Sequence, residues 1–152
     1  LIYMLKEQLK DKFNIIALEV DKVDFSFYKD PSLISTSKTE LSKEILKRQE
    51  AEIVLVDLND YDDSEICTDV IYLIEPSTIK LNKLMLKNKD IFKELEGKKI
   101  VLNRSTIEEK EVQEFEYEAR TKIFANIPCI DDRKLPNDKI KELANKLGFI
   151  RE

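Results

Sequence analysis

Polar side chains that could bind a ligand follow four short apolar runs of this 152-residue chain, each at the point where the run ends. They are Glu19 and Asp21, Asp57, Glu75, and Asn103 with Arg104. Carboxylate oxygens suit hard cations such as Mg²⁺, and an amide offers both a donor and an acceptor. Because parallel strands end at one edge of a sheet, where α/β proteins bind ligands, these residues predict a site. The alternative is that loops after strands are polar in any case, so that Asp57 only caps a loop.

The apolar runs have the length and composition of buried strands. The strongest is Ile53–Asp57, IVLVD, which we expect to be the central strand of a parallel sheet. Further strands are predicted at 15–21, 70–74 and 100–102. The segment 24–36 contains Pro31 and several serines and is interpreted as a long connection. The acidic segment 59–68 lacks the central glycine of a calcium loop, and we interpret it as a solvated loop rather than a cation site.

Helices are predicted between the strands from apolar periodicity and capping residues. Their expected ranges are 1–13, 38–49, 78–95 with a break near Lys87, 106–123 and 138–147. In the first helix Ile2, Leu5 and Leu9 should face inward, with lysines and acids on the other side. In the second, Leu41, Ile45 and Leu46 should face inward. Segments 37–40 and 105–108 have capping-box spacing, Ser77 is a cap, and Gly97 and Gly148 are stop signals.

Strands that alternate with helices predict an α/β fold, a three-layer sandwich with a mostly parallel sheet. At 152 residues the chain fits a single domain, 1–152. Charged residues make up 38% and the net charge is −5 with both signs mixed, so there is no nucleic-acid signal. No segment has transmembrane length. Cys67 and Cys129 are in no metal spacing and are expected to be reduced, buried thiols of a cytoplasmic protein.

Two absences limit the chemistry of these residues. There is no histidine, which excludes Ser-His-Asp and Cys-His nucleophiles and most transition-metal sites. There are only two glycines, which leaves no glycine-rich phosphate loop within the chain. The chain begins at Leu1 rather than methionine, which suggests that a segment upstream is missing.

The order of these motifs resembles the MinD/ParA family of P-loop ATPases, the deviant Walker-A group, from the helix after the phosphate loop onward. The matching segments are the acid-x-acid strand end 19–21, the Walker-B strand 53–57, the polar turn 71–77, the Asn-Arg strand end 103–104 and the Ile-Pro loop 127–132. The resemblance implies a P-loop NTPase-like fold whose first strand and phosphate loop precede Leu1. Family members carry Asp where Glu19 stands, and a glycine soon after the Walker-B acid that this chain lacks.

The resemblance also implies roles for individual residues. Asp57 would orient the water shell of a nucleotide-bound Mg²⁺, and Asp21 would position water near the phosphates of ATP. Asn103 and Arg104 at one strand end, with Pro128 and Asp131 in the next loop, would bind the nucleotide base. Each also has a structural interpretation, such as a strand-end cap for Asp57. The family relation further implies a homodimer with protein partners, although the C-terminus lacks the amphipathic membrane-targeting helix that some members use.

Three functions remain open at this point. The first is an ATP-binding switch that acts in protein positioning, in pilus or secretion assembly, or in partitioning. It hydrolyses ATP only if a phosphate loop lies upstream, since phosphoryl transfer depends on the loop and the metal. The second is a degenerate domain that keeps the fold but acts as a protein-interaction module. The third is a receiver-like or other flavodoxin-type domain in which acids at strand ends bind Mg²⁺, which accounts for Asp21 and Asp57 but not for the Asn-Arg strand end.

Overall fold

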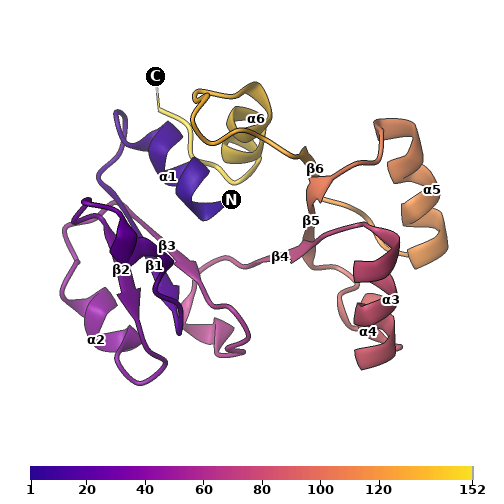
Figure 1. Ribbon diagram of the computed structural model, residues 1–152, viewed down its shortest axis with the longest axis horizontal. Helices are drawn as coiled ribbons and strands as arrows, with labels where there is room; N and C mark the ends of the chain where they lie inside the picture. The colour runs from indigo at the N-terminus through magenta and orange to yellow at the C-terminus, as the bar shows by residue number, and fades with distance from the viewer. Residues whose placement is uncertain (152) are drawn as a thin grey trace. The chain divides into compact units, whose positions relative to one another are not determined.

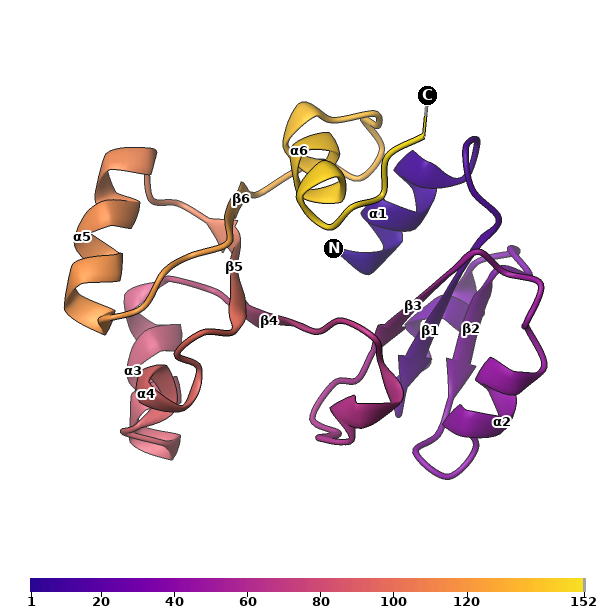
Figure 2. The same ribbon diagram turned by 180° about the vertical axis from the view of Figure 1, so that it is seen from behind.

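The computed structural model describes residues 1–151 and divides the chain into two compact units (Figures 1 and 2). Unit 1 contains residues 1–68 and the chain from residue 135 onward, and unit 2 contains residues 69–134. Each unit holds a three-stranded, fully parallel sheet with helices. The predicted α/β class and parallel pairing are confirmed. The strands form two sheets rather than the expected single one. Among the residues described, β3 pairs only with β1 and β4 pairs only with β5, so no hydrogen bonds join the two sets of strands into one sheet.

Unit 1 has strand order β2-β1-β3. Its elements are α1 (Ile2–Leu9), β1 (Ile15–Val20), the 3₁₀ turn Asp24–Phe27, β2 (Leu33–Thr36), α2 (Leu41–Leu46), β3 (Ile53–Asp57), the 3₁₀ turn Ser64–Ile66 and α6 (Asp138–Lys146). The range predicted for Ile53–Asp57 is confirmed, but β1, not β3, is the central strand and is buried at all six positions. The segment 24–36, predicted as a connection, contains β2. Its four residues are too few to show a period, and two of them are Ser35 and Thr36.

Both faces of β1 are covered, as the alternation of side chains along a strand requires. Ala17 packs with Phe25 and Leu33 and with residues of α1. Leu18 and Val20 point to the opposite face, where they pack with Leu41 of α2 and with apolar residues of β3 and the loop after it. This burial on both faces explains why the run 15–20 is almost uninterrupted in its apolar character.

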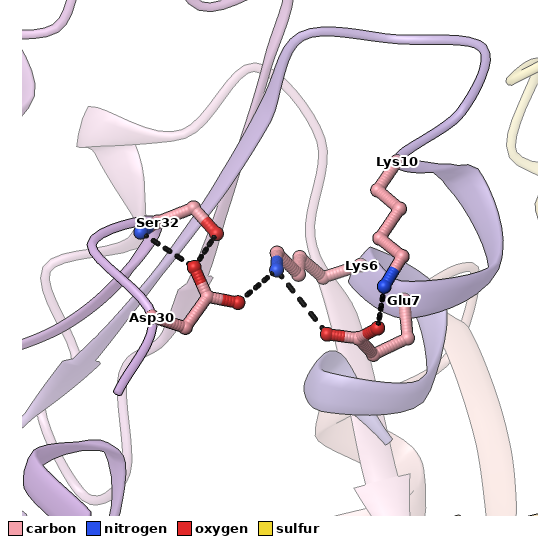
Figure 3. A network of polar contacts seen from close by, with 5 residues as sticks. All are labelled: Lys6, Glu7, Lys10, Asp30 and Ser32. Atoms are coloured by element: carbon pink, nitrogen blue, oxygen red, sulfur yellow. Dashed lines mark hydrogen bonds and ion pairs between the residues drawn. The ribbon is translucent and has the colours of Figure 1, made fainter. Parts of the chain in front are cut away.

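Helix α1 carries a buried lysine that the sequence prediction placed on its exposed side. Lys6 is only 4% exposed, between the apolar residues Leu5 and Leu9. Its Nζ donates to Asp30 Oδ2 at 2.5 Å and to Glu7 Oε1 at 3.2 Å (Figure 3). Buried charges persist when they are paired. The pair with Asp30 therefore joins α1 to the loop before β2.

Helix α6 confirms the predicted C-terminal helix and packs against α1 (Figures 1 and 2). Asn137 caps it, because its side chain accepts from the backbone N–H groups of Lys139 and Ile140 at 2.8 and 3.3 Å. Gln8 of α1 hydrogen-bonds both the N–H and the C=O of Asn137. Gly148 follows the helix at φ +88°, the left-handed conformation that favours glycine.

Unit 2 has strand order β4-β5-β6, which follows the chain. Its elements are β4 (Ile71–Ile74), α3 (Thr78–Lys87), α4 (Ile91–Glu94), β5 (Lys99–Ser105), α5 (Glu109–Ala119) and β6 (Ala125–Pro128). All three helices contribute to one core cluster built on Ile100 and Leu102 of β5. Consecutive right-handed crossovers in one direction place helices on the same face of a sheet. Helices α3, α4 and α5 accordingly share one face (Figures 1 and 2).

The predicted helix caps are confirmed in part. Ser77 caps α3 by accepting from the Lys80 N–H at 3.3 Å. The box predicted for Ser105 forms three residues later, between Glu108 and Glu111, because β5 continues through Ser105. Residues 37–40 form no box. Helix α2 starts only at Leu41, and its Leu46 is 64% exposed rather than inward.

Two further findings concern the thiols and the membrane. Cys67 is half-buried and Cys129 is exposed, so the expectation that both are buried is wrong. No helix within residues 1–151 combines the length and the apolar character needed to cross a membrane.

Candidate functional site

The C-terminal edge of the β1 and β3 strands forms a cluster of acids and lysines in unit 1. Asp57 is the last residue of β3, and its Cα is in register with Glu19 of β1. Its Oδ2 accepts from Lys22 Nζ at 3.0 Å, and its Oδ1 accepts from the backbone N–H of Asn59 at 2.9 Å. The hydrogen bond to Asp57 raises the pKa of Lys22 above its usual value. Asp57 is therefore both a loop cap and one half of an ion pair.

Asp21, the first residue after β1, is held at the same edge. It adopts φ +55°, in the left-handed region that Asp tolerates better than most residues. Its Oδ1 accepts from the backbone N–H of Lys38 at 3.4 Å, and Lys38 Nζ lies 3.8 Å from its Oδ2. The same ammonium lies 5.6 Å from the centre of the Tyr61 ring. Each predicted catalytic carboxylate in unit 1 thus has a lysine of its own chain as partner.

Lys22 and Lys38 were absent from the sequence prediction. Lys22 directly follows Asp21, and Lys38 is the second residue after β2, so their positions next to strand ends were a usable signal. Lysine belongs in such a cluster because two carboxylates at one edge repel each other, and a nearby cation offsets this repulsion.

Glu19 is a structural residue rather than a member of the exposed cluster. It is 2% exposed, and its Oε1 accepts from the backbone N–H of Phe25 and from Ser35 Oγ, both at 2.8 Å. These bonds fix the turn after β1 and hold β2 beside it. The Glu19 side chain is thus engaged by the turn after β1 and by β2.

Asn103 and Arg104 lie in a bulge at the end of β5 in unit 2. Regular pairing with β6 is interrupted between Leu102 and Ser105, and Arg104 adopts φ +51°. A bulge redirects side chains at a strand end and is frequent near binding sites. Arg104 is exposed and Asn103 is half-buried. Glu75, the fourth predicted strand-end acid, is half-buried directly after β4.

The predicted loop residues of unit 2 follow from β6. Pro128 is the exposed last residue of this strand, in register with Ser105. Asp131 lies three residues on and accepts three hydrogen bonds from Arg133, two from the guanidinium at 2.9 and 3.0 Å and one from the backbone N–H at 3.0 Å. These bonds lower the pKa of Asp131 and raise that of Arg133. Asp131 is thus engaged with a neighbour in its own loop.

One buried amide in unit 2 is only half satisfied. Asn126 of β6 donates through Nδ2 to the Ile107 carbonyl at 3.1 Å, while its Oδ1 is buried without a hydrogen-bond partner among the residues described. The donated bond attaches the loop before α5 to β6. Asn126 is a strand residue that none of the predicted strands included.

The predicted site residues therefore form two groups, one in each unit. Asp21 and Asp57 lie at the ends of the neighbouring strands β1 and β3 of unit 1. Asn103, Arg104, Pro128 and Asp131 belong to β5, β6 and the loop after it in unit 2. Within residues 1–151 no group of three or more Asp, Glu, Cys or His side chains is arranged to hold a metal ion. A single carboxylate such as Asp57 fits Mg²⁺ only if water and a phosphate complete the coordination.

The fold and this edge define an α/β protein with a carboxylate and lysine cluster at the C-terminal ends of neighbouring parallel strands. A comparison of the chain with protein-family models and with curated proteins finds no match.

Proposed function

We propose that the chain is the nucleotide-binding switch domain of a MinD/ParA-like ATPase. The observation that carries this proposal is the position of Asp21 and Asp57 in the β2-β1-β3 sheet. Strand order reverses at β1, and ligands of open α/β sheets bind beyond the strand ends at such a reversal. Both acids lie at this point. The left-handed backbone of Asp21 and Asn59 supports the proposal, because uncommon conformations gather at functional sites.

The proposed roles follow the resemblance. Asp57 would help hold a nucleotide-bound Mg²⁺, which supplies charge neutralisation for the phosphates when bound. Lys22 would leave Asp57 when the nucleotide-bound Mg²⁺ arrives. The Asp57–Lys22 ion pair would then be the resting state of the domain without nucleotide. Asn103, Arg104, Pro128 and Asp131 are proposed for the base. The proposal requires a phosphate loop and a strand outside residues 1–152, and the edge of β3 that is not paired with β1 is available to that strand.

The test is calorimetric titration of Mg-ATP into the native protein that includes the residues before Leu1. We expect saturable binding that Asn103→Ala weakens by about tenfold, since losing a hydrogen bond costs roughly 1 kcal/mol or more. Asn145→Ala, on an exposed position of α6, is the matched control. Absence of Mg-ATP binding by the wild type overturns the proposal. Binding of Mg²⁺ without nucleotide that is lost in Asp57→Asn favours the receiver-like alternative.

The second candidate is a degenerate domain that binds protein partners without nucleotide turnover. Two observations favour it: Lys22 already neutralises Asp57, and residues 58–67 contain no glycine whose backbone could approach a phosphate. The substitution Lys22→Met separates the candidates. If the ion pair is a resting state, the variant should bind Mg-ATP at least as tightly as the wild type. If the pair only stabilises the fold, the variant should lose stability and gain no affinity.

A further inference from the structure

Two neighbouring helices of unit 2 carry opposite charge. The segment 77–89, which contains α3, has four lysines and no acidic residue. Helix α5 has five glutamates and one lysine. Both helices pack on the core cluster of one sheet face, so their outer sides belong to one surface of unit 2 (Figures 1 and 2). This surface, which we call the α3/α5 face, is therefore basic on one half and acidic on the other.

The charged residues of the α3/α5 face surround exposed apolar side chains. On α3, Ile79 and Leu86 are 61% and 89% exposed and flank Lys83 on one stripe. On α5, Tyr117 is 86% exposed beside Glu114 and Glu118. A shallow hollow lies around Tyr117. Aromatic and apolar anchors within a polar surround are typical of protein interfaces.

Four charged side chains of this face form no ion pair among the residues described, although Lys110 of α5 pairs with Glu108. Within residues 1–151 no ion pair involves Lys80, Lys83, Glu114 or Glu118. All four side chains are exposed. They are thus available to an external partner of matching charge.

We propose that the α3/α5 face binds the same face of a second copy of this chain. A two-fold axis places each surface patch against its own copy turned by half a revolution. A face that is basic on one half and acidic on the other is complementary to itself under that operation. Each α3 then meets the partner's α5, so the lysines of either copy lie opposite the glutamates of the other copy.

An anionic membrane is the other partner that basic α3 suggests, since lysines flanking apolar residues are typical of helices that bind lipid surfaces. The acidic half of the same face argues against it. Helix α5 would be repelled by the negative surface potential that attracts α3. A second copy satisfies both halves, whereas a membrane satisfies one.

The experiment is a charge exchange measured by sedimentation velocity without nucleotide. The wild type should form a dimer. Lys80→Glu with Lys83→Glu makes both helices acidic, and Glu114→Lys with Glu118→Lys makes both basic. Each double variant should raise the dimer dissociation constant by about tenfold or more, because like charges then face each other. An equimolar mixture of the two variants should form a heterodimer with near wild-type affinity, and this recovery also proves that both variants are folded.

The matched control is Lys12→Glu with Lys141→Glu, which changes the net charge equally at exposed lysines of unit 1. It should dimerise as the wild type does.

A monomeric wild type at about 1 mM, the weak end of specific affinities, overturns the proposal. So does a dimer that is insensitive to both double variants. Co-sedimentation of the monomer with phosphatidylserine vesicles, lost in the α3 variant, assigns α3 to a membrane instead. Because no nucleotide is added, these results are independent of the proposed ATP binding.

Discussion

Replacing Lys6 by methionine tests whether the buried lysine of α1 stabilises unit 1 through Asp30 (Figure 3). Burial alone would raise the pKa of Asp30, but hydrogen bonds from Lys6 and Ser32 outweigh it and lower this pKa from 3.8 to about 2. That difference corresponds to roughly 2 kcal/mol of folding free energy. The hydrogen bonds from Lys6 and from Ser32 both contribute to this folding free energy. Lys6→Met keeps the apolar stem, so we expect a loss of about 1 to 2 kcal/mol near neutral pH.

The pH dependence distinguishes this electrostatic effect from lost packing. Because the pKa of Asp30 is lower in the folded chain than in the unfolded one, its contribution is complete above 3.8 and disappears as the pH falls toward 2. The wild type and Lys6→Met should therefore differ in unfolding free energy near neutral pH and converge at low pH. Urea unfolding followed by circular dichroism at a series of pH values measures this difference.

A double-mutant cycle and a control complete the test. With Asp30→Asn already present, Lys6→Met should cost clearly less than in the wild type, since the two charges interact directly. Lys10→Met removes the exposed lysine that binds Glu7 and should cost much less than Lys6→Met, because solvent screens an exposed ion pair. The reasoning is refuted if Lys6→Met destabilises the chain equally at all pH values, or if the cycle gives no coupling.

Three other predictions concern separate parts of the chain. Glu19→Ala should lower the unfolding free energy by about 2 to 3 kcal/mol in urea titrations, because two donors lose their acceptor at a buried site, and Glu19→Gln should recover part of the loss. Arg120 ends α5 at φ +55°, so Arg120→Gly should raise the melting temperature, through a gain of about 0.5 to 1 kcal/mol, and a lower melting temperature would contradict this. Burial raises the pKa of Cys67, so a thiol reagent should modify exposed Cys129 first; faster modification of Cys67 would be inconsistent with the structure.

The sequence predicted the elements whose signal is local. The strand Ile53–Asp57, the cap at Ser77 and the helix ending before Gly148 depend on hydrophobic runs, one hydroxyl and one left-handed glycine, all of which operate within a few residues. The short strand β2 was missed, because its four residues are stabilised by pairing with β1 rather than by their own pattern.

The candidate site shows the same division. Sequence alone predicted that Asp21 and Asp57 follow strands, because an apolar run ending in an acid is visible along the chain. That these strands are neighbours, with Lys22 and Lys38 as the partners of the two acids, was decided by tertiary structure. Sheet order depends on contacts between residues far apart in the chain, and no local propensity encodes it. For the same reason Lys6 is identified as a surface residue from its type, and only its pairing with Asp30 allows it to be buried.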